Sequence, residues 1–110
     1  MADISPVDPI FVALSDGTRR AVVGLLREKP YRAGELSGAL GIDPASLSRH
    51  LRVLRKAGIV SGEHPEHDAR VRLYRLRPEA FASLRHWLDE VEAFWNIQLD
   101  AFAEHMEHKR

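Results

Sequence analysis

The chain of 110 residues contains no cysteine, which excludes disulfide bonds, thiolate metal sites and thiol redox switches. It also has no apolar run long enough to span a membrane. Its first residues, Met1 to Ile4, lack the basic-then-apolar pattern of a secretion signal, so we expect a cytoplasmic protein. The length predicts one domain, residues 1–110, whose modest core makes an obligate dimer plausible.

The chain also lacks net charge, because 16 basic side chains balance 16 acidic ones. The charges are nevertheless unevenly distributed. Residues 1–42 balance at zero, residues 43–77 carry eight basic and four acidic groups, and residues 78–110 carry three basic and seven acidic groups. Nucleic-acid binding depends on a local basic surface rather than on net charge, so the middle segment is the candidate for contact with a polyanion.

Four short helices are predicted in the first half of the chain. Apolar periodicity and the positions of proline and glycine place them at residues 9–14, 18–28, 33–40 and 44–56, after a frayed arm. Gly24 lies inside the second helix, where glycine costs about 1 kcal/mol relative to alanine. A close contact with another helix is one explanation for a glycine at this position.

The third and fourth helices have the spacing of a helix-turn-helix, residues 33–57. Gly41 supplies the turn between them. Asp43 is expected to cap the fourth helix, and Pro44 occupies its first position, where a missing N–H costs nothing. Such an element exists to place its second helix in the major groove of DNA.

The fourth helix divides into an apolar face and a polar face. A stripe at i, i+4 and i+7 faces the core and consists of Leu47, Leu51 and Leu54. The outward positions are small, hydroxyl-bearing or basic, as contact with base edges and phosphates requires. These candidate DNA-binding residues are Ala45, Ser46, Ser48, Arg49, His50 and Arg52. His50 could instead pack at the shoulder of the helix, and a merely solvated helix face is the alternative for the whole group.

A β-hairpin, the wing at residues 59–76, is predicted next, with strands at 59–61 and 71–76. Arg70 and Arg72 alternate there and could straddle the DNA backbone. The same hairpin carries three acidic residues, Glu63, Glu66 and Asp68. Either the tip stays off the DNA or these acids pair with the two arginines. Apolar residues fall on both faces of the second strand, which a bulge or a twist would reconcile.

The last segment, residues 78–108, is predicted to form one helix about 45 Å long, with a break near Asn96 as an alternative. Apolar residues recur along it at spacings of three or four, over a greater length than one small domain can cover. The simplest partner is the same helix of a second copy. The predicted dimer interface consists of Leu84, Leu88, Val91, Trp95, Leu99 and Phe102.

Several short motifs occur together along residues 13–99. They are ALSDGTRR at 13–20, GEL at 34–36 with LG at 40–41, SRHL at 48–51, AGIV at 57–60, RLYRL at 72–76 and FW at 94–95. In combination they resemble the ArsR-type family of bacterial winged-helix repressors, in a branch without the family's well-known metal motifs. Gly17 stands where that family usually has proline, and Arg32 where it usually has a threonine cap.

The resemblance implies a winged helix-turn-helix with the element order α-α-α-α-β-β-α. It also implies a homodimer joined by its terminal helices, with two recognition helices in successive major grooves of a palindromic operator. Residue by residue, the family's DNA contacts fall on Ser46, Ser48, Arg49 and His50. We therefore expect a homodimeric repressor of its own or a neighbouring promoter.

Metal control is the first alternative, since many members of the family repress until a metal binds. The thiolate site of the third helix is missing here. In the terminal helix, His105 and His108 supply half of a site, but Phe94 stands at a position where a ligand is needed. His64, His67 and Asp68 form a weaker cluster in the hairpin. We expect no bound metal or cofactor, and keep His105 and His108 as the main metal candidates.

Three further alternatives concern function. The chain could be a protein-interaction module that uses its aromatic terminal helix. An enzyme is not expected, because the acid and base groups of that helix face solvent without a nucleophile or phosphate loop; they are His86, Asp89, Glu90 and Glu92. An organic effector could bind between terminal helices near Trp87, Phe94 or Trp95, although plain dimer core is the alternative for these rings.

Overall fold

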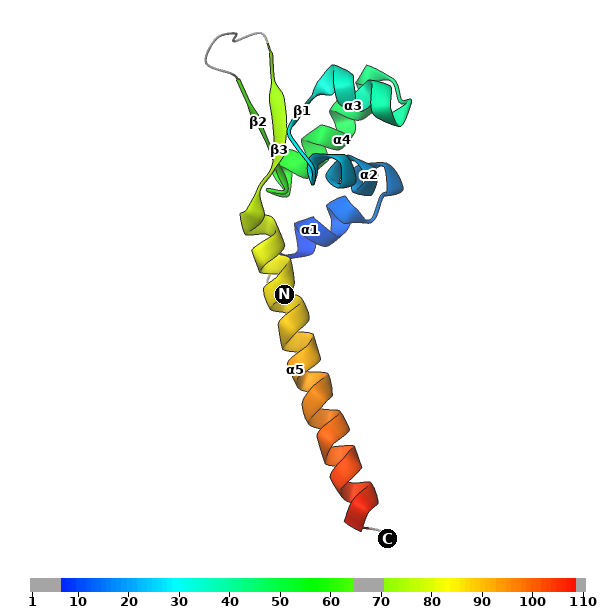
Figure 1. The fold of residues 1–110 in the computed structure, drawn as a ribbon, viewed down its shortest axis with the longest axis vertical. Coiled ribbons are helices and arrows are strands. Elements are labelled where there is room, and N and C mark those ends of the chain that lie inside the picture. The colour runs from blue at the N-terminus through cyan, green and yellow to red at the C-terminus, as the bar shows by residue number, and fades with distance from the viewer. Residues whose placement is uncertain (1–6, 65–70, 109–110) are drawn as a thin grey trace, which may run out of the picture.

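The computed structural model describes residues 7–64 and 71–108 (Figure 1). Their elements are, in chain order, α1 (Val7–Leu14), α2 (Gly17–Leu26), β1 (Tyr31–Arg32), α3 (Ala33–Leu40), α4 (Pro44–Lys56), β2 (Val60–Glu63), β3 (Leu73–Leu76) and α5 (Pro78–His108). This mainly helical fold with a small antiparallel sheet confirms the predicted winged helix-turn-helix. The order departs from the prediction in one place, where β1 lies between α2 and α3.

Helices α3 and α4 have the predicted bounds because their ends are fixed locally. Gly41 ends α3 in the left-handed conformation, with φ of 66°. The Asp43 carboxylate accepts the Ser46 amide at 2.9 Å and thereby caps α4. Arg32 makes no side-chain cap at α3, as expected, and its own amide donates to Glu35 Oε1 at 2.9 Å.

Helices α1 and α2 differ from the predicted ranges. Helix α1 begins two residues earlier than predicted, at Val7, whose side chain is buried. Helix α2 ends at Leu26, two residues early. The close helix contact offered as one explanation for Gly24 is not found, since a Cβ atom there would meet nothing within 4 Å. Gly24 instead lines an open hollow of about 480 Å³ between α2, β3 and the first turn of α5.

The sheet has three strands in the order β1-β3-β2, and both pairings are antiparallel. The hairpin register runs without interruption from Val60 opposite Leu76 to Glu63 opposite Leu73, so no bulge is needed. The facing of β3 is settled by Tyr74, which is buried, and by its neighbour Arg75, which is exposed. Tyr74 belongs to the buried core cluster, and β1 pairs with the second edge of β3 through Tyr31 opposite Tyr74.

The core lies where α2, α3, α4 and the sheet meet, and it fixes how the helix-turn-helix is presented. Its largest fully buried side chains are Leu36, Leu47, Leu54, Ile59, Val22 and Val60. The predicted leucine stripe of α4 is confirmed, because Leu47, Leu51 and Leu54 are all buried. The opposite face of α4 is therefore turned outward.

Helix α5 is continuous past Asn96 and projects away from the rest of the fold (Figure 1). The whole molecule, with α5 included, measures 70 × 31 × 27 Å. Its first turns pack on the core through Ala80, Phe81 and Leu84. Only Arg77 separates β3 from α5, and its amide donates to the Ile59 carbonyl at 2.8 Å. No helix in the described ranges combines the length and the apolar character that crossing a membrane requires.

Candidate nucleic-acid interface

The outward face of α4 brings together the residues predicted to contact DNA. Ala45, Ser48, Arg49 and Arg52 are exposed there, opposite the buried leucines. Two hydrogen bonds from Ser46 lower the pKa of the Asp43 carboxyl. The bond from the Ser46 amide has the larger effect and the bond from its hydroxyl the smaller one. Asp43 is thus ionised at neutral pH and holds the first turn of the helix in place.

Ser46 is half-buried, and its hydroxyl is engaged within the protein. It donates to Asp43 Oδ2 at 2.7 Å and accepts from Arg49 Nη2 at 3.1 Å. Three residues of the same turn therefore form a chain of polar contacts that orients the Arg49 guanidinium. Arginine has further donors beyond this contact, so Arg49 keeps the capacity to bind a base edge or a phosphate.

His50 has partners that the sequence pattern did not reveal. Its Nδ1 atom lies 3.2 Å from Arg19 Nη1 and 3.9 Å from Asp16 Oδ1, and the side chain is half-buried. Arg19 also donates to the carbonyls of Ala13 and Val12. These contacts favour the shoulder position for His50, where it ties α4 to the corner between α1 and α2.

Asp16 completes this corner. Its carboxylate accepts the Arg19 amide at 3.0 Å, and this hydrogen bond is the main cause that lowers the pKa of the carboxyl group. The motif at residues 13–20 therefore has a structural role in the fold: it caps α2 and places Arg19 against His50. The pairing joins residues 31 positions apart in sequence, which local periodicity does not predict.

In the described part of the wing, Arg72 and Arg75 have different surroundings. Arg72 is half-buried and passes close over Gly62, because a Cβ atom on that glycine would lie 2.7 Å from Arg72 Cδ. Glu63 forms an ion pair with Arg75 at 3.2 Å, not with Arg72 as one alternative proposed. The other residues in that alternative, Arg70, Glu66 and Asp68, lie outside the described residues.

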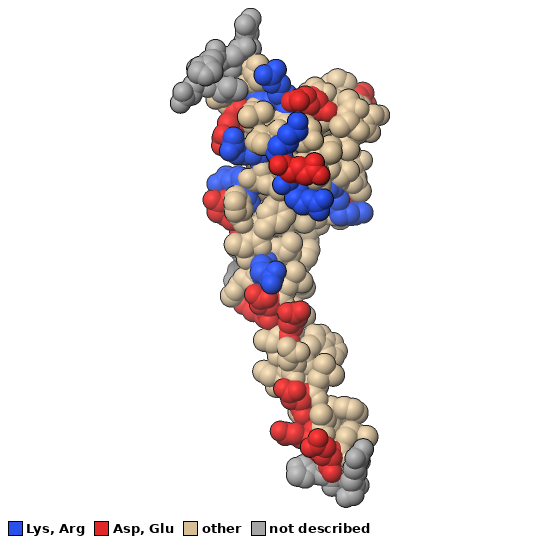
Figure 2. All heavy atoms as spheres, viewed as in Figure 1, with Lys and Arg blue, Asp and Glu red and all other residues tan. Residues whose placement is uncertain are grey.

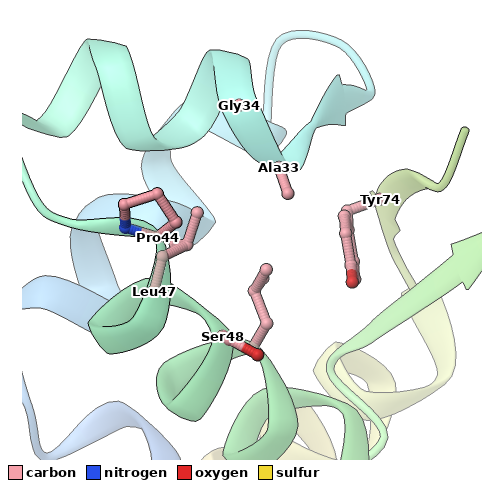
Figure 3. Close-up of a pocket in the computed structure, with 7 residues that line it drawn as sticks. Ala33, Gly34, Pro44, Leu47, Ser48 and Tyr74 are labelled. Carbon is pink, nitrogen blue, oxygen red and sulfur yellow. The ribbon is translucent and has the colours of Figure 1, made fainter.

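A small pocket of about 100 Å³ opens beside this surface, between the starts of α3 and α4 and strand β3 (Figure 3). Its lining residues are Ala33, Gly34, Pro44, Leu47, Ser48, Leu51 and Tyr74. Tyr74 stands as one wall of the pocket, and Ala33 and Ser48 lie across from it (Figure 3). The sequence did not predict this pocket, because apolar residues on both faces of β3 left the facing of Tyr74 undecided.

The surface charges divide as the sequence indicated. Figure 2 shows lysine and arginine side chains gathered on the globular part of the molecule and acidic side chains along α5. The recognition face of α4 and the wing belong to the globular part. A polyanion would therefore approach that part and not the distal half of α5.

The predicted dimer residues divide into two groups. Leu84 packs partly on the core of its own chain, and Val91 is half-buried. The others are exposed; they are Leu88, Trp95, Leu99 and Phe102. Of the rings suggested for an effector, Trp87 packs edge-on against Phe11 with centroids 5.0 Å apart, whereas Phe94 and Trp95 are open to solvent.

The metal candidates are not brought together into a larger group of ligands. His105 is exposed on α5, and the side chain of His108 lies outside the described part of the structure. Among the residues that the structure describes, no three histidine or acidic side chains form a cluster that could hold a metal ion. His64 Nδ1 lies 2.9 Å from the Val71 carbonyl instead.

Comparison with known proteins gives consistent matches. The family profile described as bacterial regulatory protein, arsR family, matches residues 16–61. The HTH-type transcriptional regulator Rv2034 of Mycobacterium tuberculosis is 39% identical over 97 residues, which cover 88% of this chain and 85% of that protein. The transcriptional repressor SdpR of Bacillus subtilis is 36% identical over 52 residues, or 47% of this chain and 58% of SdpR.

Solved structures agree with these sequence matches. The crystal structure of an ArsR family transcriptional regulator, RHA00566, has a TM-score of 0.75 and 31% identity to this chain. The match covers 87% of this chain and 97% of that one.

Proposed function

This chain belongs to the ArsR family of bacterial regulatory proteins and is a DNA-binding transcriptional regulator, and we propose that it acts as a homodimeric repressor of its own or a neighbouring promoter. The observation that carries the proposal is the outward face of α4, where serine and arginine side chains oppose a buried leucine stripe. The relative SdpR is named a transcriptional repressor. We propose a cytoplasmic location as well, because a repressor must reach the bacterial promoter on which it acts.

DNA binding would use α4 as the recognition helix. Ala45 leaves room for the helix to enter the major groove, while Ser48, Arg49 and Arg52 are exposed and supply donors to base edges and phosphates. Ser46 would act mainly on Arg49, because its hydroxyl already bridges Asp43 and Arg49. Arg72 would follow the backbone from the wing.

Dimerisation would use the distal part of α5. Its exposed large apolar side chains are Leu88, Phe94, Trp95, Ile97, Leu99, Phe102 and Met106. So many apolar groups along one helix are typical of a partner surface, and a second α5 offers the same apolar stripe in return. Two recognition helices would then reach half-sites one turn of DNA apart, roughly 34 Å.

The protein-interaction module is the weaker alternative, since the relatives matched here are named as transcriptional regulators. The metal-responsive repressor has no observation in its favour beyond two histidines near the end of α5. If an effector exists, it must bind the DNA-competent and DNA-incompetent dimers with different affinities.

The test is fluorescence anisotropy of the purified protein with DNA from upstream of its own gene and with a scrambled duplex of equal length, at several salt concentrations. We expect tight binding to the upstream DNA, weaker binding to the scrambled duplex, and a steep fall in affinity as salt rises. Equal and weak binding to both duplexes would contradict the proposal and direct attention to protein partners of α5.

A further inference from the structure

The hollow between α2, β3 and the start of α5 has the size and the composition of a small-molecule site. Its volume is about 480 Å³, and ligand pockets in proteins commonly measure roughly 300–1,000 Å³. Apolar, half-buried side chains that pack against the core make up most of its lining; they are Leu14, Val23, Leu76 and Phe81. Such a surface can cover the apolar body of a ligand.

Gly24 keeps this hollow open. It lies inside α2, where alanine would stabilise the helix relative to glycine. A Cβ atom at this position would meet nothing within 4 Å, so packing does not demand a glycine. The backbone does not demand one either, because Gly24 lacks the positive φ of Gly41 and Gly58. The effect of the glycine is therefore to leave space, since a longer side chain would project into the hollow that Gly24 lines.

The charged side chains that line the hollow are of one sign. Arg20 lies in α2 and Arg27 at its C-cap, seven residues apart, which places them on the same face and roughly 10 Å apart along the axis. Arg20 donates to the Leu14 carbonyl at 2.8 Å and keeps further donors. The Arg27 side chain forms no hydrogen bond or ion pair with any residue that the structure describes. None of the described residues that line the hollow is acidic.

A second hollow of similar size does not share this charge pattern. It measures about 430 Å³ and lies between α1 and the end of α4. One acidic, one basic and four apolar residues line it; they are Asp8, Pro9, Val12, Val53, Lys56 and Ala57. Charges of both signs give an anion no preference for this hollow. The hollow at Gly24 differs by its excess of positive charge, and the second hollow provides an internal control.

We propose that the hollow at Gly24 binds an amphipathic organic anion, which acts as the effector of this regulator. The carboxylate of the ligand lies against Arg20 and Arg27, because guanidinium groups match carboxylates through paired hydrogen bonds. Its apolar body covers Val23 and Phe81. The effector role rests on the proposed function, whereas the binding site itself does not.

The position of the hollow explains how a ligand could act on DNA binding. Its walls belong to α2, to the wing strand β3 and to the first turn of α5, the helix that carries the exposed apolar side chains proposed for the dimer. A ligand in the hollow therefore contacts the wing strand and the dimer helix together. It can favour one arrangement of these elements over another, as an effector must.

The probe is octanoate, a short apolar chain with one carboxylate, titrated into the isotope-labelled protein and followed by NMR. We expect the amide resonances of Gly24 and Phe81 to shift, while those of Val12 and Ala57, at the second hollow, stay in place. Two further compounds separate the parts of the ligand, since octanol keeps the chain without the charge and acetate keeps the charge without the chain. Each should shift Gly24 and Phe81 less than octanoate does at the same concentration.

Two variants test the apolar and the charged parts of the site separately. Gly24→Leu fills the hollow and should abolish the shift at Phe81, while leucine, the better helix former, raises the melting temperature. Arg27→Gln should weaken octanoate binding by roughly three- to tenfold, because the lost ionic hydrogen bond is partly screened by water. Arg55→Gln is the matched control and should bind octanoate as the wild type does, since Arg55 is exposed on α4 and does not line the hollow.

The effector role is measured by anisotropy with the upstream DNA, without octanoate and with octanoate at saturation. We expect octanoate to weaken DNA binding by the wild type roughly fivefold or more, which is an ordinary coupling between two sites. Binding by Gly24→Leu should not respond. The same response in both proteins, or no response in either, would overturn the effector role.

The outcomes separate the site from the function. If octanol shifts Gly24 and Phe81 as much as octanoate does, the arginines have no role and the anionic ligand is wrong. If Gly24→Leu turns a dimer into a monomer in sedimentation velocity, a second copy occupies the hollow and the ligand site is overturned. If the wild type binds no DNA but binds octanoate in a way that depends on Arg27, the site stands and the proposed function fails. Selective DNA binding without any shift at Gly24 would mean the reverse.

Discussion

The globular part of the molecule, α1 to β3, and the distal half of α5 bury their apolar side chains in different ways. In the globular part, leucines from α3 and α4 pack with Val22 and Ile59, and all of these side chains are almost inaccessible to solvent. In the distal half of α5, rings such as Phe94 and Trp95 remain more than half exposed. The apolar side chains of the globular part are covered by other residues of the same chain. Those of the distal half of α5 are as apolar as a core, but no residue that the structure describes covers them.

The largest difference between the two regions should appear on truncating a leucine in each. Leu54 is 0% exposed and Leu99 is 58% exposed. We expect Leu54→Ala to lower the free energy of unfolding by about 2–5 kcal/mol, since it leaves a cavity in a close-packed core. Leu99→Ala should change the stability of a dilute monomer far less. Urea denaturation followed by circular dichroism measures both, and equal losses at low concentration would contradict the comparison.

A second prediction concerns self-association. Trp95→Ala removes a large apolar surface from α5 and should shift the protein from dimer to monomer, with DNA affinity falling as a consequence. Glu104→Ala is the control and should remain dimeric, because Glu104 is exposed and lies on the opposite face of α5 from Trp95. Sedimentation velocity at several concentrations measures the change. A stable Trp95→Ala dimer would show that α5 is not the interface.

A third prediction returns to the globular part. Arg49→Ala should weaken specific DNA binding by about 1–3 kcal/mol and relax the base preference at one position, if Arg49 reads a base edge. Arg85→Ala is the matched control, because it removes the same charge from α5, where Arg85 pairs with Asp89. Anisotropy titrations with single-base operator variants measure both. Equal losses for the two variants would mean that only net charge matters.

The smallest effect on stability is expected when acid protonates Asp43, the residue that caps α4. The pKa of Asp43 lies below its ordinary value of 3.8 because the Ser46 amide and hydroxyl bond its charged form. The carboxylate therefore stabilises the fold fully above pH 3.8, and this contribution is lost as the pH falls through the lower folded-state pKa. Asp43→Asn should flatten the fall in melting temperature below pH 3.8. An identical acid profile in both proteins would contradict this role.

The sequence predicted best the features that depend on a few neighbouring residues. The bounds of α3 and α4 were correct because Gly41, Asp43 and Pro44 fix those ends locally. The leucine stripe of α4 was also correct, since helical periodicity alone places it on one face. These features determine the exposed surface that carries the proposed DNA contacts.

Features that depend on distant residues were missed. Strand β1 has only two residues, Tyr31 and Arg32, and exists through its pairing with β3. The inward facing of Tyr74 depends on its packing in a core that is built from several helices and strands. His50 meets Arg19 across 31 positions of sequence. Gly24 shows the reverse case, since its cost in the helix suggested a close contact and the structure has an open hollow.

The short joint between β3 and α5 has a mechanical consequence. Arg77 alone connects the two elements, its amide is bonded to Ile59, and Pro78 restricts the first turn of α5. Helix α5 is thus joined to the wing strand β3 without a flexible linker. A tilt of α5 would therefore act both on the wing strand through Arg77 and on the core through Ala80 and Phe81.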